Sequence, residues 1–487
     1  MMLSTDPIRL RANQQLDSGR KVELGQFMTP DATANFMAGL FDEPSGPVRL
    51  LDPGAGVGSL TIAFARTFPR ASVAAECWEL DPVMRRHLVS SLETAASRAP
   101  GFEYSVRADD FIEGAATELI SRKMPRYTHA IQNPPYAKIN SQSRHRLVLR
   151  AVGVETVNLY SGFLALTILA MEKGGQVVAI IPRSFCNGSY FKPFRALMFR
   201  ECALRHIHVF ESRRKAFKDD AVLQENVIVR LDRGVPQGDV VVSSSAGLDF
   251  DGCPSRTVPF ASIIKPDDED LFIHIPSPKE TSVPAFSPLC AGMLKEVGLE
   301  VSTGPVVDFR MAEDVRKEPE PGTVPLLYAH HFKKGILSWP DSVHRKPNAI
   351  RVSNASRRWL MPSGVYVLVK RFSSKEERRR ITAYVLESSD LPGELIGIEN
   401  HWNVFHIGKS GLDFELACGL AAFLNCTATD EAFRVFSGHT QVNAGDLRKM
   451  AFPDRETLRK LGRKAGKGPH SQETVDALIS EMEGTDG

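Results

Sequence analysis

Residues able to take part in binding or catalysis end several short apolar runs in the first 140 residues. The most distinctive run, 127–132, leads into Asn133-Pro134-Pro135-Tyr136. Two prolines cannot continue a sheet, because each lacks an N–H and has a fixed φ. The turn therefore holds an amide, a backbone carbonyl and an aromatic ring in fixed relation. This set suits a planar ring that carries an amino group, although an ordinary strand-end turn explains it equally well.

A glycine-rich turn, residues 54–58, follows the apolar run that ends at Asp52 and precedes a helix-like run. Glycines let the backbone approach a ligand, and a helix N-terminus offers N–H groups. Such a turn alone also occurs in nicotinamide and flavin enzymes. The acid at position 52 would repel a pyrophosphate, whereas it could hold a positively charged amino-acid moiety.

Two further strand ends carry acids. Glu79 is placed to accept both hydroxyls of a ribose. Asp110 offers a carboxylate to an exocyclic amine, and Phe111 offers a ring to stack on it. Each acid alone is also explained as a helix cap or a solvated loop residue. Four such strand ends in series favour one shared site.

The elements that must position these residues alternate between strand-like and helix-like runs, which is typical of an α/β sheet with crossover helices. Helices are predicted at 59–67, 82–96 and 162–173. We predict seven strands, at 48–52, 72–79, 104–108, 129–133, 176–181, 206–210 and 226–231.

Composition limits the class of protein. With 43% hydrophobic and 24% charged residues the chain can bury large cores, and its 487 residues predict more than one domain. It has no apolar run long enough to span a bilayer and no secretory signal, and its seven dispersed cysteines indicate reduced thiols and no metal site. We therefore expect a cytoplasmic protein. A net charge of +2 requires local patches for any polyanionic partner.

The second half has more Pro, Gly, Ser and basic stretches than the first. We predict domains at 1–235 and 236–455, followed by a charged tail at 456–487 that forms a surface helix. Basic stretches at 344–358 and 370–380 suit phosphate contacts, although such runs are usually only solvated. Gln441 and Asn443 could read adenines or cap a helix, with capping favoured, and residues 400–403 are similarly suggestive. Residues 138–150 are either a basic loop beside the site or a surface helix.

The order of motifs resembles a known family. Gln26-Phe27-Met28-Thr29-Pro30, the 52–58 turn, Glu79, Asp110-Phe111 and the 133–136 turn are similar to the S-adenosylmethionine-dependent DNA amino-methyltransferases, above all the gamma-type adenine enzymes of restriction–modification systems. The resemblance covers about the first 235 residues well. It implies a seven-stranded Rossmann-like methyltransferase domain, followed by a mixed α+β target recognition domain.

The resemblance also implies which residues bind S-adenosylmethionine. Thr29 and Pro30 would close over its methionine end, and Asp52, Ala55 and Gly56 would hold its amino-acid part. Glu79 would take its ribose and Asp110 its adenine amine, while Phe111 and Phe163 would sandwich the adenine. Asn133 would also belong to the cofactor-binding set.

The same resemblance assigns the target base to a second set. The Asn133 side-chain oxygen and the Pro134 carbonyl would accept from the target amino group, in a turn stiffened by Pro135. Tyr136 and Phe217 would stack on the base. Two acceptors favour a pyramidal nitrogen whose lone pair faces the methyl, so in-line displacement needs positioning and neither a nucleophilic Cys nor a metal. Because the amino group lies inside a duplex, the base must be flipped out.

We therefore predict a site-specific adenine-N6 methyltransferase that acts on double-stranded DNA, the modification enzyme of a restriction–modification system whose cognate restriction endonuclease would act separately. The alternatives are an N4-cytosine enzyme, a group that tends to carry serine in place of Asn133, a protein-glutamine or RNA-guanine methyltransferase, and a catalytically silent DNA-binding subunit. The sequence indicates neither the DNA site nor the oligomeric state.

Overall fold

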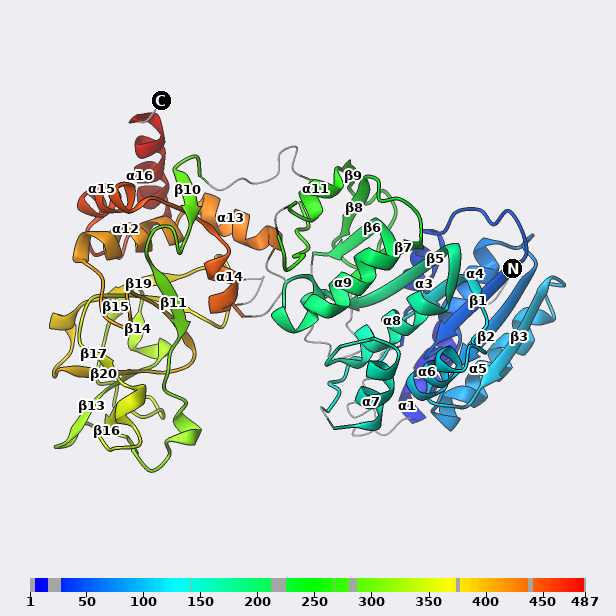
Figure 1. Ribbon diagram of the computed structural model, residues 1–487, viewed down its shortest axis with the longest axis horizontal. Coiled ribbons are helices and arrows are strands. Elements are labelled where there is room, and N and C mark those ends of the chain that lie inside the picture. Colours follow the sequence, from blue (N-terminus) through cyan, green and yellow to red (C-terminus); the bar gives the residue numbers. More distant parts are fainter. Residues whose placement is uncertain are drawn as a thin grey trace. The chain divides into compact units, whose positions relative to one another are not determined.

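The computed structural model describes residues 5–15, 28–140, 142–211, 225–266, 268–279, 287–373, 377–436 and 441–485. The chain divides into two compact units, Met1–Val283 and Pro284–Gly487, whose elements are labelled in Figure 1. Among the helices of these described ranges, none is both long enough and apolar enough to cross a membrane.

The first unit contains a sheet of nine strands in the order β3-β2-β1-β4-β5-β7-β6-β8-β9. Strands β1 to β5 are parallel to one another, and β7 runs antiparallel between β5 and β6. The predicted α/β sheet is present, but its predicted count of seven strands is not confirmed, because β8 and β9 extend it beyond β6. The strands are β1 (Val48–Pro53), β2 (Val73–Trp78), β3 (Phe102–Arg107), β4 (Tyr127–Gln132), β5 (Met171–Pro182), β6 (Cys202–Phe210), β7 (Asn226–Arg233), β8 (Val240–Ser245) and β9 (Ser255–Val258).

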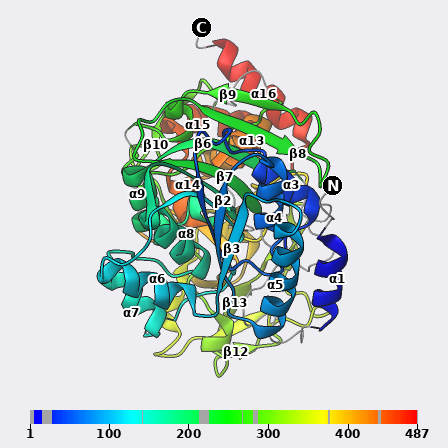
Figure 2. The same ribbon diagram turned by 90° about the vertical axis from the view of Figure 1, so that its right-hand side faces the viewer.

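Helices cover both faces of this sheet (Figure 2). Leu50 and Ile131 point into the core shared with α3, α4 and α5, whereas their neighbours Leu51 and Ala130 point into the core shared with α6, α8 and α9. This alternation follows from the two-residue period of a strand, and it explains why these strands are apolar throughout. The helices of this unit are α1 (Asp6–Gln15), α3 (Asp31–Ala38), α4 (Ser59–Thr67), α5 (Pro82–Ala96), α6 (Phe111–Ile120), α7 (Arg144–Ala151), α8 (Leu159–Ala170), α9 (Lys192–Glu201) and α11 (Phe260–Ile263).

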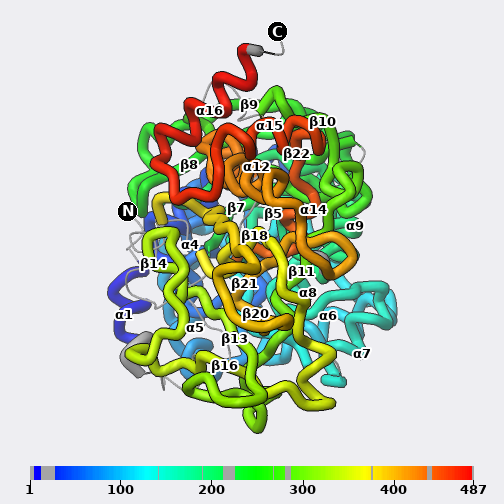
Figure 3. Tube along the Cα trace, turned by 90° about the vertical axis from the view of Figure 1, so that its left-hand side faces the viewer, coloured from blue at the N-terminus to red at the C-terminus, as the bar shows by residue number. Residues whose placement is uncertain are grey.

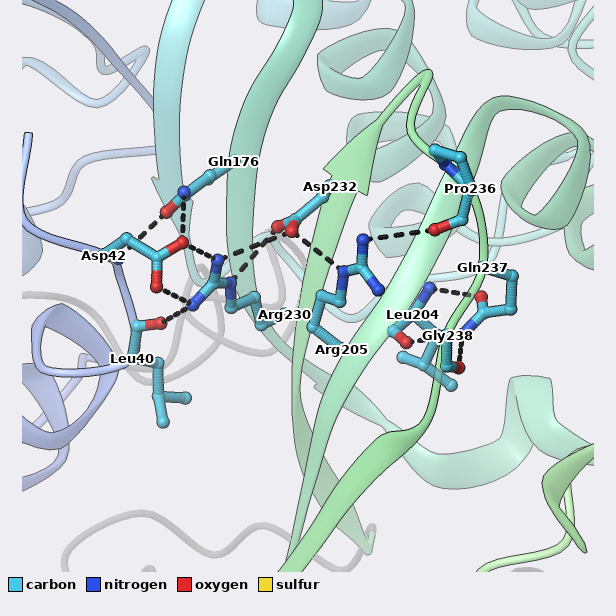
Figure 4. Close-up of polar contacts among 10 residues, drawn as sticks. All are labelled: Leu40, Asp42, Gln176, Leu204, Arg205, Arg230, Asp232, Pro236, Gln237 and Gly238. Carbon is cyan, nitrogen blue, oxygen red and sulfur yellow. Dashed lines mark hydrogen bonds and ion pairs between the residues drawn. The ribbon is translucent and has the colours of Figure 1, made fainter. Parts of the chain in front are cut away.

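The predicted domain boundary at 235/236 falls inside the first unit. The Gln237 side chain accepts from the Leu204 N–H at 2.8 Å and donates to the Leu204 carbonyl at 2.9 Å, and Arg205 donates to the Pro236 carbonyl (Figure 4). This connection is therefore held against β6 and leads into β8, which pairs with β6. The Pro and Gly content of this connection predicted a linker between domains. Because β8 pairs with β6, these residues belong instead to the first unit, which extends to Val283.

A chain of charged groups joins the elements beside this connection. Arg230 donates to Asp42 at 2.8 Å and to Asp232 at 3.1 Å, and Arg205 donates to Asp232 at 3.0 Å (Figure 4). Gln176 also donates to Asp42, whose pKa is lowered chiefly by the hydrogen bond from Arg230. These residues lie near the amino end of β4, so the network anchors the sheet away from the carboxyl ends of the parallel strands.

The second unit combines several small sheets with helices (Figure 3). One sheet has the strand order β11-β21-β18-β19, and another has the order β12-β16-β13-β20-β17. The strands are β10 (Cys290–Met293), β11 (Glu300–Thr303), β12 (Val315–Arg316), β13 (Thr323–Leu327), β14 (Phe332–Lys333), β15 (Ile336–Leu337), β16 (Ala349–Arg351), β17 (Met361–Pro362), β18 (Tyr366–Lys370), β19 (Ala383–Leu386), β20 (Leu395–Ile398), β21 (Trp402–His406) and β22 (Ala451–Pro453), and the helices are α12 (Phe414–Leu424), α13 (Thr427–Phe436), α14 (Ala444–Arg448), α15 (Arg455–Ala465) and α16 (Gln472–Thr485).

The charged tail predicted at 456–487 is not a single surface helix. It forms α15 and α16, whose apolar residues are buried in the second unit's core beside α12. The charges occupy the outer faces, so charge density along the sequence concealed the buried face. The buried residues of the tail are Leu458, Leu461, Val475, Ile479 and Met482.

Two glycines let α12 and α15 cross at very short range. A Cβ on Gly419 would lie 1.8 Å from the Leu458 carbonyl oxygen, and a Cβ on Gly462 would lie 1.7 Å from the Glu415 carbonyl oxygen. The contact is reciprocal, because each glycine also faces the backbone nitrogen of the other at 2.8–2.9 Å from the added atom. The close packing of α12 against α15 therefore requires glycine, which has no side chain, at positions 419 and 462.

Candidate functional site

A cavity of about 330 Å³ lies at the carboxyl ends of β1, β2 and β4 in the first unit. Because parallel strands place their carboxyl ends at one edge, the separate strand-end motifs meet there, which is where open α/β sheets bind ligands. Its lining combines carboxylates, glycines, aromatic rings and aliphatic side chains. The lining residues are Met28, Thr29, Gly54, Ala55, Gly56, Val57, Ser59, Leu60, Trp78, Glu79, Leu80, Met84, Asp109, Asp110, Phe111, Asn133, Pro135, His145, Leu159 and Phe163.

The glycine turn forms one wall of the cavity. Gly54, Gly56 and Gly58 have φ of 78°, 56° and 89°, in the left-handed region that other residues rarely adopt. A Cβ on Gly56 would meet no atom within 4 Å, so the side of the turn at this position is open. Helix α4 begins at Ser59, directly after the turn, and adds N–H groups at its first turn. This wall allows close approach of a ligand to backbone.

Glu79 is buried at the end of β2 and is held by backbone. One carboxylate oxygen accepts the Gly56 N–H and the other accepts the Asp81 N–H, both at 2.8 Å. Burial raises the pKa of Glu79 to about 7, against the lowering effect of these two donors. The carboxylate thus links the glycine turn to the start of α5, and its orientation is set before any ligand arrives.

Asp52 does not line the cavity. It is fully buried at the end of β1, and one oxygen accepts the Thr61 hydroxyl of α4 at 2.6 Å. The other oxygen has no hydrogen-bond partner among the described residues. Burial raises the pKa of Asp52 to about 7. Asp52 therefore does not reach the cavity wall, from which it was predicted to contact the amino-acid part of a cofactor.

Asp110 pairs with a histidine that sequence reasoning did not single out. Its Oδ1 caps α6 by accepting the Glu113 N–H, and its Oδ2 lies 3.0 Å from Nε2 of His145 on α7. Burial acts to raise the pKa of Asp110, but these hydrogen bonds lower it overall, and the Asp110 carboxylate raises the pKa of His145. Residues 144–151 form the helix α7, so this part of the segment is a helix, but it lies beside the site because its His145 lines the cavity.

If Asp110 accepts the amine of a bound adenine, replacing His145 by alanine is expected to weaken binding of that cofactor about fivefold to tenfold, because Asp110 loses a donor that fixes its carboxylate. His145→Gln, which retains an N–H donor, should recover part of the loss. Titration calorimetry with the cofactor and its demethylated product measures both values. Equal affinity of the alanine variant and the parent protein would contradict a positioning role for His145.

Asn133 lies at the carboxyl end of β4 with its amide oriented from two sides. The amide nitrogen donates to the Thr29 hydroxyl at 3.0 Å, and the Tyr136 hydroxyl lies 2.8 Å from the amide oxygen and 3.1 Å from the Ile180 carbonyl. The hydroxyl of Tyr136 is thus directed towards protein acceptors in this structure. Thr29 and Asn133, more than a hundred residues apart, meet at the same wall of the cavity.

Phe111 and Phe163 contact each other directly. Their ring centroids are 5.0 Å apart at an interplanar angle of 40°, and both rings are buried. At this separation no planar group fits between them, so the predicted sandwich differs from the arrangement seen here. The two rings instead form one continuous apolar wall, to which Trp78 adds an edge-on contact with Phe111.

The predicted site residues are distributed as follows. Thr29, Ala55, Gly56, Glu79, Asp110, Phe111, Asn133, Pro135 and Phe163 line the cavity, Pro30, Asp52, Pro134 and Tyr136 do not, and Phe217 lies outside the described residues. The lining also contains residues without a predicted site role, of which five are apolar and lie outside the glycine turn and α4: Met28, Trp78, Leu80, Met84 and Leu159. Apolar residues of this kind carry no motif, because they cannot be told from core residues in a sequence.

Comparison with known proteins assigns this site to a class. Residues 103–217, which contain the 133–136 turn, match the Eco57I restriction-modification methylase family. The part of the cavity formed by residues 109–163 therefore lies within the segment that matches this family. The chain as a whole belongs to the type II methyltransferases. The family resemblance seen in the sequence is confirmed.

Two relatives carry that assignment. The chain is 46% identical to type II methyltransferase M.BsuBI of Bacillus subtilis over 94% of this chain and 93% of the relative. It is 41% identical to type II methyltransferase M.PstI of Providencia stuartii over 98% and 96%. The fold is also similar to that of the type IIL restriction-modification enzyme MmeI in complex with DNA, with a TM-score of 0.53, 10% identity, and coverage of 99% of this chain and 74% of that chain.

Proposed function

We propose that this type II methyltransferase transfers a methyl group from S-adenosylmethionine to the N6 amino group of adenine in double-stranded DNA. The observation that carries the proposal is the position of Asn133. Its amide is fixed by Thr29 and Tyr136 at the wall of the cavity that also contains Glu79 and Asp110. In this proposal, one cavity thus contains both the Asn133 amide that accepts the target amine and the wall that binds the nucleoside of the cofactor.

The residues of the cavity fit S-adenosylmethionine. Carboxylates suit its cationic groups and hydroxyls, whereas they would repel the pyrophosphate of a dinucleotide. In this proposal Glu79 accepts the ribose hydroxyls, Asp110 accepts the adenine amine, and Phe111 with Phe163 forms the apolar wall beside the ring. The methionine part is surrounded in this proposal by Thr29, Pro30, Ala55 and Gly56. Asp52 lies just before the glycine turn in the sequence, and its buried oxygen without a hydrogen-bond partner among the described residues is the acceptor proposed for the same part. When bound, the cofactor supplies an activated methyl group.

The turn at 133–136 holds the target. The Asn133 oxygen and the Pro134 carbonyl accept the two protons of the adenine amine, and Pro135 keeps the turn rigid. Acceptors on both protons favour a pyramidal nitrogen, so its lone pair points out of the ring plane. To bind the base, the Tyr136 hydroxyl would transfer its hydrogen bond from Asn133 to the Ile180 carbonyl, which lies within 3.1 Å of it. Tyr136 and Phe217 then stack on the flipped base.

The second unit supplies the target recognition domain in this proposal, and the first unit is the catalytic domain. Duplex DNA is the partner, in keeping with the MmeI structure, which was determined with DNA. The protein would act in the cytoplasm as the modification enzyme of a restriction–modification system, beside a separate cognate endonuclease. No metal takes part in the proposed transfer.

The affinity for S-adenosylmethionine is expected to depend on pH through Glu79. Its pKa, raised to about 7 by burial, means that the carboxylate that accepts hydroxyls is the main form only above pH 7. Cofactor binding should therefore weaken as the pH falls from 8 to 6, by at most about tenfold per pH unit. Calorimetry across this range measures the effect. Glu79→Gln should bind weakly with a flatter profile, and an unchanged profile in that variant would contradict the assignment to Glu79.

The direct test of the function is transfer of a labelled methyl group. The protein is incubated with labelled S-adenosylmethionine and mixed-sequence duplex DNA, and the modified nucleoside is identified by mass spectrometry. We expect N6-methyl-2′-deoxyadenosine from the DNA, and sequencing of modified bases then gives the site. Label as N4-methylcytosine would replace the adenine assignment, label only in protein or RNA would overturn the DNA substrate, and no transfer would support a silent subunit.

A further inference from the structure

Three segments far apart in the sequence meet on the second unit. They are the end of β18 at Lys370–Phe372, the turn before β21 at Glu399–Trp402, and the start of the segment before α14 at Gln441–Val442. Phe372 and Gln441 form an isolated antiparallel bridge, and Lys370 pairs with Trp402. Each segment carries polar or aromatic residues, and the fold brings the three segments side by side.

The backbone of this surface is rigidly linked. The Arg371 N–H donates to the His401 carbonyl at 2.9 Å, and its guanidinium donates to the Asn400 carbonyl at 3.1 Å. The Val442 N–H donates to the Arg371 carbonyl at 2.7 Å, and the buried amide of Asn403 donates to the Val442 carbonyl, also at 2.7 Å. Side chains carried by these segments therefore have fixed starting positions, as a recognition surface requires.

A buried carboxylate orients His401. Both oxygens of Glu399 lie 2.5–2.6 Å from Nδ1 of His401, and one of them also accepts the His401 N–H at 2.9 Å. The Glu399 side chain is 1% exposed, whereas that of His401 is 44% exposed. With Nδ1 directed inwards, the opposite ring nitrogen, Nε2, is presented away from the carboxylate. This arrangement sets both the ring orientation and the tautomer.

A small hollow of about 310 Å³ accompanies the histidine and is lined by Ala329, Lys370, Phe372 and His401. Phe372 is 49% exposed, and its ring centroid lies 4.7 Å from that of His401. Exposure of a phenylalanine costs hydrophobic free energy, and here the exposed ring is packed on an oriented histidine beside a lysine, a combination that suits a contact surface. Asn443 does not belong to it, because its N–H and amide bind Asp446 at the start of α14, which is the favoured capping role.

We infer that Lys370, Phe372 and His401 form a duplex-DNA contact surface of the second unit, on which His401, oriented by Glu399, hydrogen-bonds a base edge, Phe372 packs against the DNA and Lys370 contacts a phosphate. The inference rests on the proposed function. A lysine meets the charge of the phosphate backbone, an imidazole nitrogen held in one direction suits a base edge, and an exposed aromatic ring suits sugar or base faces. Glu399 is a positioning residue, since it reaches DNA only through His401.

Binding measurements on the full chain test this surface. Fluorescence anisotropy is recorded with a short duplex that contains the methylation site and with an unrelated duplex of equal length. His401→Ala is expected to reduce the preference for the site duplex tenfold or more, and Phe372→Ala to weaken binding to it by about tenfold. Lys370→Ala should weaken binding to both duplexes similarly and reduce the salt dependence by about one counterion. Glu399→Gln should reproduce part of the His401→Ala loss of preference.

Matched variants provide the controls. Phe414→Ala removes another half-exposed phenylalanine of the same unit, and Lys295→Ala removes an exposed lysine of that unit; both should bind like the parent protein. Phe372, Lys370 and His401 variants that behave like these controls would overturn the inference while DNA methylation by the parent protein stands. Absence of DNA methylation by the parent protein would instead overturn the proposed function. Thermal unfolding and cofactor binding, both expected to stay unchanged, show whether a variant is folded.

Discussion

Replacing Asn133 by alanine is expected to lower methyl transfer to DNA by about 10²- to 10³-fold or more, while cofactor affinity changes only a fewfold. A hydrogen-bonding group that acts on the reacting atom contributes about this much when its interaction strengthens in the transition state. In the proposed function, by contrast, the cofactor is held mainly by Glu79, Asp110 and the glycine turn. Single-turnover transfer and calorimetric cofactor binding separate the two effects.

Tyr136→Phe is the matched variant, because it keeps the ring and removes only the hydroxyl that lies 2.8 Å from the Asn133 oxygen. We expect a much smaller change in transfer, within a fewfold, because in the proposed function this hydroxyl releases the Asn133 oxygen when the base binds. If Asn133→Ala loses cofactor affinity and transfer in equal proportion, the residue shapes the cofactor cavity and does not position the target amine. Full activity of the alanine variant would refute both roles.

Gly419→Ala and Gly462→Ala are each expected to destabilise the second unit by about 3 kcal/mol or more, at the upper end of overpacking effects. The added methyl would lie less than 2 Å from a carbonyl oxygen in either case, and backbone cannot turn aside as a side chain can. Helices α12 and α15 would have to separate, which would expose Leu458 and Leu461. Urea unfolding followed by far-UV circular dichroism measures the loss, with limited proteolysis to locate it.

Gly445→Ala is the control, since it lies in α14 and a Cβ there would meet no atom within 4 Å. This variant should be neutral or more stable by up to about 1 kcal/mol, because alanine restricts the unfolded chain. S-adenosylmethionine binding by the first unit should survive in all three variants. Stabilities of the Gly419 and Gly462 variants close to that of Gly445→Ala would show that the helices cross less tightly than described here.

Much of the site was predictable because parallel strands obey a simple geometry. An apolar run followed by a polar residue marks the carboxyl end of a buried strand, and all such ends share one edge. Glu79, Asp110, Asn133 and the glycine turn were therefore expected to meet, and they line one cavity. Only the structure distinguishes the environments of the two acids at 52 and 79. Glu79 lines the cavity, whereas Asp52 is buried outside the lining and binds Thr61.

The sequence by itself determined seven of the nine strands of the sheet, the strand-end motifs and the family, because these depend on local patterns and short motifs that can be recognised in the sequence alone. Tertiary structure alone decided the pairing of β8 with β6, the burial of the charged tail, the His145–Asp110 contact and the meeting of residues 370–372, 399–402 and 441. Each of these joins segments separated along the chain. Their energies depend on packing and hydrogen bonds between partners that no local pattern specifies.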